Sequence, residues 1–160
     1  MEPEPSPMIL VLGASGYVGG RLVPELLRSG FAVRCMTRTP EGLSGTGWAR
    51  EVEVVEGDLS DLSTIEAAFD DVDQVVYLVH SLGVGDDFMQ QERVTANHAR
   101  VAAERAGVRH LVYVGGLGDD DDDLSPHLRS RHDVGRELAS GPTPVTEVRA
   151  AIILGAGSAS

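Results

Sequence analysis

Short apolar runs alternate along the chain with segments in which apolar residues recur every three or four positions. Continuous apolar runs are typical of strands buried on both faces, and the spaced segments are typical of helices that cover a sheet. The pattern predicts six strands, at residues 8–12, 31–37, 52–56, 74–79, 110–114 and 145–154. It predicts helices between them, at about residues 18–29, 61–69, 87–106 and 125–140.

This alternation defines the expected fold class. Apolar strands separated by helices form a parallel sheet that is covered on both faces. Right-handed crossovers then restrict the topology to a few arrangements. We expect an α/β fold with a doubly wound parallel sheet, strand order 3-2-1-4-5-6, in an α/β/α sandwich of three layers. In such a sheet the ligand lies across the carboxyl ends of the strands.

The turn after the first strand carries glycines spaced three apart, between an apolar run and a helix-like pattern. Gly13 lets the backbone turn sharply, Gly16 lets the main chain approach a phosphate, and Gly19 lets helix and sheet pack closely. An anion then sits on the free N–H groups at the positive end of the helix. The turn predicts a binding site for the pyrophosphate of a dinucleotide. Its expected residues are Gly13, Ser15, Gly16, Tyr17, Val18 and Gly19.

The end of the second strand favours NADP(H) over NAD(H). An acidic residue at this place commonly binds the ribose 2′-hydroxyl of NAD, whereas the 2′-phosphate of NADP needs an arginine. Here the strand ends in Thr37-Arg38, and the next carboxylate is Glu41. A guanidinium matches a phosphate in charge and in bidentate geometry. Arg38 is therefore expected to bind the 2′-phosphate, with a solvated surface arginine and NAD(H) binding as the alternatives.

Further candidate cofactor residues follow the third and fourth strands. Asp58, with Leu59 after it, is placed to accept a hydrogen bond from the adenine amino group, or else to start the next helix. The segment Val79-His80-Ser81 ends the fourth strand beside the point where the strand order reverses. We expect its backbone and Ser81 to line a ribose of the cofactor. His80 titrates near neutrality in its free form, with a structural role as the alternative.

Composition excludes several function classes. The net charge of −12 excludes nucleic-acid binding as a main role, because that role needs a concentrated positive face. All 13 basic residues are arginines, which excludes chemistry that depends on lysine. The single cysteine, Cys35, falls in a strand and predicts a buried thiol in a reducing compartment. No apolar run reaches membrane-spanning length, and residues 1–7 lack the basic and apolar regions of a signal peptide, so we expect a flexible tail there. With nothing to suggest disulfides, we expect a cytoplasmic protein. Its expected partner is a small-molecule substrate.

Several motifs occur in the order of one known superfamily. They are Gly13-Ala-Ser-Gly16-Tyr-Val-Gly19, Gly57-Asp58-Leu59, Asn97 and Val148-Arg149. Together they resemble the short-chain dehydrogenase/reductase superfamily, and most closely its extended and atypical, NmrA-like NAD(P)-binding members. The resemblance implies a Rossmann-like NAD(P)-binding domain over residues 8–160, without most of the C-terminal segment that completes the substrate pocket. It also implies a homodimer as one expected assembly.

The resemblance fails at the catalytic residues. Such enzymes carry a Ser at the end of the fifth strand and a Tyr-x-x-x-Lys on the next helix. The Tyr exchanges the substrate proton, while the Lys lowers its pKa and holds the nicotinamide ribose. Here the strand runs into Gly115-Gly116. One alignment of the helix puts Leu128 and His132 at the Tyr and Lys positions, and a shift by one residue puts His127 and Arg131 there.

Two function classes therefore remain. As an enzyme, the protein transfers hydride from NADPH to a small organic substrate, with His132 as proton donor and Arg131 as its electrostatic partner. As a binding module, it is a catalytically inactive NADP(H) sensor or regulatory domain. The missing Ser, Tyr and Lys favour the second class for this chain, and the resemblance favours an NADP-dependent oxidoreductase for the intact protein.

Overall fold

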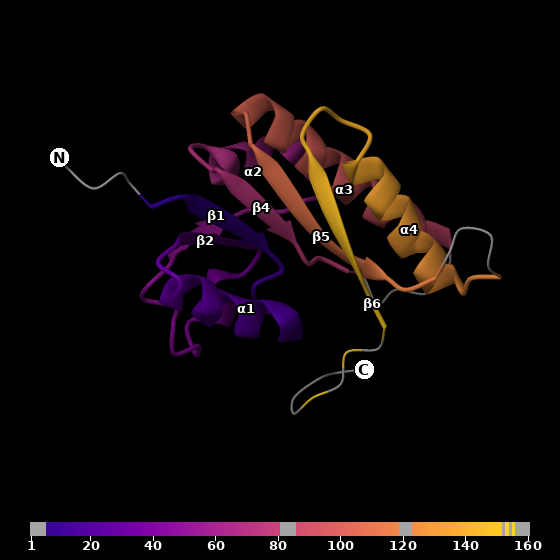
Figure 1. The fold of residues 1–160 in the computed structure, drawn as a ribbon. Coiled ribbons are helices and arrows are strands. Elements are labelled where there is room, and N and C mark those ends of the chain that lie inside the picture. The colour runs from indigo at the N-terminus through magenta and orange to yellow at the C-terminus, as the bar shows by residue number, and fades with distance from the viewer. Residues whose placement is uncertain (1–5, 81–85, 119–122, 152, 154, 156–160) are drawn as a thin grey trace.

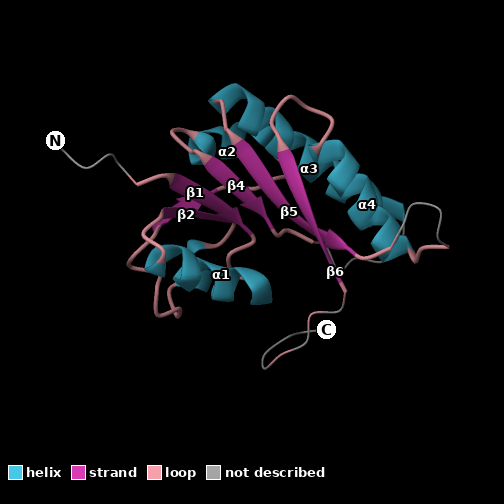
Figure 2. Ribbon diagram, in the orientation of Figure 1, coloured by secondary structure: helices cyan, strands magenta, loops and turns pink. Residues whose placement is uncertain are grey.

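The computed structural model describes residues 6–80, 86–118, 123–151, 153 and 155, which include a central sheet with helices on both faces (Figure 1). The helices are α1 (Tyr17–Arg28), α2 (Leu62–Phe69), α3 (Asp86–Ala106), α4 (Pro126–Leu138) and a short 3-10 helix, η1 (Pro40–Leu43). In Figure 2, α1 lies on one face of the sheet, and α2, α3 and α4 lie on the other. Residues 1–5 of the expected tail lie outside the described residues.

The sheet contains six parallel strands in the order β3-β2-β1-β4-β5-β6, which confirms the predicted topology. The strands are β1 (Met8–Leu12), β2 (Ala32–Thr37), β3 (Glu53–Glu56), β4 (Gln74–Tyr77), β5 (His110–Gly116) and β6 (Val145–Ala150). The order reverses between β1 and β4, so the chain crosses from one half of the sheet to the other after β3. This arrangement places the ends of β1 and β4 at the position where open sheets bind ligands.

The carboxyl ends of three strands differ from the prediction: β4 and β6 end earlier, and β5 runs two residues further, to Gly116. β4 stops at Tyr77 because the last bond to its neighbour β1 is the one that Leu78 N donates to Leu12 O, at 2.9 Å. β6 stops at Ala150, four residues before the predicted end, because its partner β5 ends at Gly116. The described apolar residues that follow β4 and β6 therefore leave the sheet at its carboxyl edge. Leu78, Val79, Ala151 and Ile153 line cavities there, and Leu78 and Val79 also pack against the core.

The helices begin close to the predicted residues, but their first turns are not all capped in the same way. Asp61 accepts a hydrogen bond from Ser63 N at the start of α2, and Ser125 accepts one from Leu128 N at the start of α4. No side chain caps the start of α1 in this way.

Among the described residues, no helix combines the length and apolar character that a membrane crossing requires.

Each face of the sheet has its own apolar core. The core under α2, α3 and α4 contains the large buried side chains Phe69, Tyr77 and Tyr113. The core under α1 contains Trp48 and Cys35, both buried. Burial raises the pKa of the Cys35 thiol to about 12, so the thiol stays protonated and unreactive. The burial of Cys35 confirms the prediction of a buried cysteine. The two close-packed cores give the carboxyl edge of the sheet a rigid support on both faces.

Candidate functional site

Two adjoining cavities lie at the carboxyl edge of the sheet, where the strand order reverses. The larger cavity, of about 980 Å³, is bounded by the ends of β1, β2 and β4, the turn after β3, and α3. The smaller cavity, of about 570 Å³, is bounded by the start of α1, the end of β5, α4 and the residues after β6. Leu78 and His80 line both cavities, so the two meet at the end of β4.

The glycine positions of the turn between β1 and α1 leave little or no room for a side chain. Gly13 has a φ of +92°, and a Cβ at this position would lie 3.1 Å from the Leu78 carbonyl carbon. A Cβ at Gly19 would lie against the Gly13 carbonyl oxygen and 2.6 Å from Ala14 Cα, closer than real contacts allow. Gly16 N donates to Gly13 O at 3.1 Å, which closes the turn. The start of α1 is thereby held tightly against the end of β1.

The start of α1 is suited to an anion. Its N-cap is Gly16, no side chain accepts a hydrogen bond from its first-turn amides, and its first turn contains no acidic residue. The first amides of a helix have no partner within the helix, and the helix dipole makes this end positive. The α2 and α4 helices use Asp61 and Ser125 for the same purpose. At α1 the capping position is thus left to a ligand.

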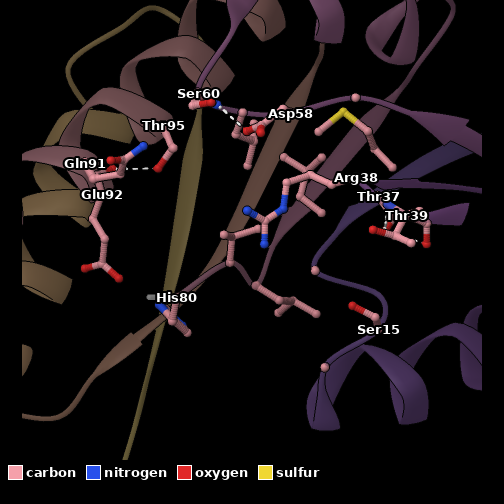
Figure 3. Close-up of a pocket in the computed structure, with 18 of the residues that line it drawn as sticks. Ser15, Thr37, Arg38, Thr39, Asp58, Ser60, His80, Gln91, Glu92 and Thr95 are labelled. Carbon is pink, nitrogen blue, oxygen red and sulfur yellow. Dashed lines mark hydrogen bonds between the residues drawn. The ribbon is translucent and has the colours of Figure 1, made fainter. Parts of the chain in front are cut away.

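Most of the predicted cofactor residues lie around the two cavities (Figure 3). The larger cavity is lined by Gly13, Ser15, Gly16, Arg38, Asp58, Leu59, Val79 and His80. Tyr17 and Val18 line the smaller cavity, which also contacts His80. Gly19 is buried behind the turn, and Ser81 lies outside the described residues. The residues just before α1 therefore face the larger cavity, and the first residues of the helix face the smaller one.

The larger cavity contains a cation and a carboxylate. Figure 3 shows the exposed Arg38 side chain extending into the cavity, and its guanidinium has no hydrogen bond or ion pair to any described residue. Asp58 Oδ1 accepts a hydrogen bond from Ser60 N at 2.8 Å. This bond lowers the pKa of Asp58, and the charge of Arg38 lowers it further. The carboxylate is therefore ionised, and the guanidinium remains open to a ligand.

His80 presents an unsatisfied acceptor where the two cavities meet. Its Nε2 lies 3.0 Å from Val114 O, and because a carbonyl oxygen only accepts, Nε2 carries the proton. Burial lowers the pKa of His80 to about 4, and the charge of Arg131 contributes to the same shift. The ring is therefore neutral near pH 7, with a lone pair on Nδ1. This buried atom has no partner among the described residues, so a donor on a ligand would satisfy it.

The structure places the two alignments of α4 differently. His127, Leu128 and Arg131 line the smaller cavity. His132 lines neither cavity: it is 2% exposed, and its Nε2 lies 3.3 Å from Gly116 O. Adjacent helix positions point about 100° apart, so residues 127 and 131 share a face from which residue 132 turns away. The expected proton donor His132 thus lies within the protein, and the second alignment is the one that faces the cavity.

Glycines stand at the end of β5, where the resemblance leads one to expect a serine. A Cβ at Gly116 would lie 2.6 Å from Leu128 Cδ2 and 3.3 Å from Arg131 Cδ. A Cβ at Gly115 would lie against the Glu147 carboxylate. The hydroxyl of Tyr113 donates to Arg131 O at 2.9 Å and so ties α4 to β5. Side chains of α4 therefore pack closely on Gly116, and the Glu147 side chain of β6 packs closely on Gly115.

The α3 helix supplies side chains to the larger cavity that the sequence analysis missed. Among them are Phe88, Glu92 and Thr95. Glu92 is only 6% exposed and accepts a hydrogen bond from the Ser130 hydroxyl on α4. The Thr95 and Tyr77 hydroxyls lie 3.2 Å apart. A sequence signal was present, because Glu92 interrupts the otherwise apolar buried face of a helix.

Comparison with known proteins gives a family match and several curated relatives. Residues 13–141 match the model of a family described as NAD(P)H-binding. The chain is 31% identical over 115 residues to the 3 beta-hydroxysteroid dehydrogenase/Delta 5-->4-isomerase of Mycobacterium tuberculosis. That match covers 66% of this chain and 30% of the relative, so the chain spans about a third of the length of this relative.

Solved structures share the fold. The Citrobacter sp. triphenylmethane reductase complexed with NADP(H) has a TM-score of 0.74 and 24% identity, and the match covers 91% of this chain and 50% of that one. The Bordetella bronchiseptica enzyme WbmG in complex with NAD has a TM-score of 0.74 and 22% identity, covering 93% and 55%. At this level of identity the likeness shows the fold alone. The two neighbours carry different cofactors, so the fold does not decide between them.

The tight turn makes a prediction about stability. Gly19→Ala should lower the free energy of unfolding by about 2 kcal/mol or more, because the added methyl meets backbone atoms that cannot move aside. Gly20→Ala is the matched control, since a Cβ there meets nothing within 4 Å and alanine favours a helix by about 0.5–1 kcal/mol. Urea unfolding of both variants measures the difference, and equal stabilities would contradict the described turn.

The half-buried His80 makes a prediction about pH. In the unfolded chain the imidazole protonates near pH 6.5, whereas in the folded protein its pKa is about 4. The unfolded state then binds more protons, so stability is lost as the pH falls from 6.5 towards 4. Between pH 7 and 4.5, His80→Gln should lose about 2 kcal/mol less than the unchanged protein in urea unfolding. Identical losses in the two proteins would show that His80 is not buried in neutral form.

Proposed function

This chain belongs to the NAD(P)H-binding family, within the short-chain dehydrogenase/reductase superfamily, and we propose that its two cavities hold NADP(H) as the cofactor of an oxidoreductase. The observation that carries the proposal is the uncapped start of α1 behind a glycine turn that excludes side chains. Free amides at a positive helix end bind phosphate without any other charged group. The cavities on either side of this helix start provide room for the two halves of a dinucleotide.

The residues present fit such a cofactor. We assign the adenosine half to the larger cavity, where Arg38 and Asp58 lie, and the nicotinamide half to the smaller cavity. His80 Nδ1, buried and without a described partner, accepts a hydrogen bond from a ribose hydroxyl or from the carboxamide. Asp58 accepts one from the adenine amino group. When bound, the cofactor supplies or accepts a hydride.

Arg38 supports NADP(H) over NAD(H). It directly follows β2, where an NAD-binding domain carries a carboxylate for the ribose 2′-hydroxyl. Its guanidinium lines the cavity without a hydrogen bond or ion pair to a described residue. A 2′-phosphate offers it bidentate, charge-assisted hydrogen bonds, whereas a 2′-hydroxyl offers no charge. The difference in affinity between the two cofactors should therefore depend on this one side chain.

Binding of both cofactors to Arg38→Ala tests the preference. NADPH binding should weaken by about 1.5–3 kcal/mol, the usual contribution of a hydrogen bond to a charged group, and NADH binding should stay almost unchanged. Arg50→Ala is the control, because Arg50 is also exposed near the same loop but lines neither cavity. Calorimetry or cofactor fluorescence gives both affinities. Equal affinities for NADPH and NADH before and after the Arg38 change would remove Arg38 from the site.

For the reaction, we propose His127 as the proton donor in place of His132. It lines the smaller cavity on the same face of α4 as Arg131, and its ring packs against Phe88 with centroids 5.1 Å apart. Imidazole is the side chain most often used for proton transfer near neutral pH. Arg131 then stabilises the negative charge that develops on the substrate oxygen before it is protonated.

Steady-state NADPH consumption across a panel of carbonyl, quinone and flavin acceptors tests this role. His127→Gln should lower kcat by about a hundredfold, the usual contribution of a general acid. His110→Gln is the control, since His110 is the first residue of β5 and lies at the amino ends of the strands, away from the cavities. A full rate in the His127 variant would exclude it as the donor. Tight NADPH binding without turnover of any acceptor would instead support the alternative function.

The alternative function is an NADP(H) sensor without catalysis. It is favoured by one observation: the end of β5 is Gly115-Gly116, and α4 presents an imidazole and a leucine to the cavity where a phenol is expected. Both functions use the same cofactor residues. The two functions differ only in whether a substrate reacts with the bound cofactor in the smaller cavity.

A further inference from the structure

The smaller cavity has an apolar wall. Its larger aliphatic side chains are Val18, Leu78, Val114, Leu117, Leu128 and Ile153. Leu117 and Ile153 are also 56% and 39% exposed, so part of this wall is open to solvent. An apolar surface that lines a cavity and remains open to solvent is typical of a ligand-binding groove. The wall therefore favours an apolar ligand.

One cation interrupts this wall. Arg131 lies half-buried on α4, and its guanidinium has no hydrogen bond or ion pair to any described residue. The other two arginines of α4 have partners within the protein: Arg136 forms an ion pair with Asp133 at 2.5 Å, and Arg129 donates a hydrogen bond to Leu124 O at 3.4 Å. The position of Arg131 is fixed from two sides, by the bond from Tyr113 to its carbonyl and by the packing of its stem on Gly116.

The electrostatic effect of Arg131 reaches into the cavities. Its charge lowers the pKa of His80, and it acts in the same direction on Tyr113 against the larger effect of burial. A partly desolvated guanidinium without a counter-ion is costly, and an oxyanion placed on it forms a charge-assisted bond that is stronger in an apolar setting than in water. Because the net charge of the protein is −12, the positive potential at Arg131 contrasts with the acidic surface around it.

We propose that the smaller cavity binds an apolar molecule that carries one oxyanion, of the carboxylate or enolate type, with the oxyanion on Arg131 and the apolar body against Leu117, Leu128 and Ile153. The inference rests on the proposed function, because it names the substrate class for the cavity assigned to the nicotinamide half. When a molecule of this class binds, its carbon skeleton lies beside the cofactor and its oxyanion contacts Arg131 on α4. A neutral apolar molecule uses only the wall, and a small polar anion uses only Arg131.

Two fluorescent probes that differ in charge test the proposal. The probes are 8-anilinonaphthalene-1-sulfonate, an apolar anion, and N-phenyl-1-naphthylamine, its neutral counterpart. Arg131→Leu should lower the affinity for the anionic probe at least tenfold, because one charge-assisted bond is lost. The affinity for the neutral probe should stay within about twofold, because the apolar wall remains. Arg131→Lys should restore most of the binding, since it keeps the charge.

Matched variants locate the effect. Arg129→Leu, on the same helix but outside the cavity, and Arg38→Ala, in the larger cavity, should leave both probes unchanged. Arg131→Gln is the second test variant if Arg131→Leu does not fold, as judged by circular dichroism. Binding of the anionic probe that does not depend on residue 131, or that depends on Arg38 instead, would overturn the proposal.

NADPH affinity, measured in the same variants, separates this inference from the proposed function. Arg131→Leu should leave NADPH affinity within about twofold, because the proposal places the substrate, not the cofactor, on this guanidinium. A large loss of NADPH affinity with unchanged probe binding would make Arg131 a cofactor residue and overturn the inference alone. Failure of the unchanged protein to bind NADPH would overturn the proposed function, while the probe comparison would still decide the anion site.

Discussion

The packing of Gly19 against the carbonyl of Gly13 is the contact on which the rest of the site depends. It brings the start of α1 onto the end of β1 with no side chain between them. A methyl group at residue 19 would separate the helix from the strand, and the amides of the first turn would move with it. The same contact sets the boundary between the two cavities, because Ser15 and Gly16 line one and Tyr17 and Val18 line the other.

Charge in this acidic protein is distributed so that cations remain available at the cavities. Several arginines are neutralised by carboxylates, among them Arg28, Arg34, Arg100, Arg105, Arg109 and Arg136. Arg38 and Arg131 have no such partner among the described residues, and each lines one cavity. With His80 neutral between them, the two guanidinium groups and the start of α1 supply the positive potential of the site.

The sequence predicted the elements and their order because hydrophobic periodicity, glycine spacing and crossover handedness all depend on local sequence. It missed the ends of β4 and β6, which are set by where the neighbouring strands stop. It also favoured His132 over His127, because a spacing motif allows two alignments and only packing shows which helix face meets the cavity. Glu92 escaped notice for the same reason: its role depends on Ser130, a residue of another helix.

The central claim is that the first turn of α1 binds the pyrophosphate of the cofactor, and amide chemical shifts measure this directly. In ¹H–¹⁵N spectra of the labelled protein, added NADPH should cause the largest changes at the amides of Gly16, Tyr17 and Val18, because hydrogen bonds to phosphate shift amide protons strongly. Saturating shifts that spare these three amides and cluster elsewhere on the protein would contradict the account.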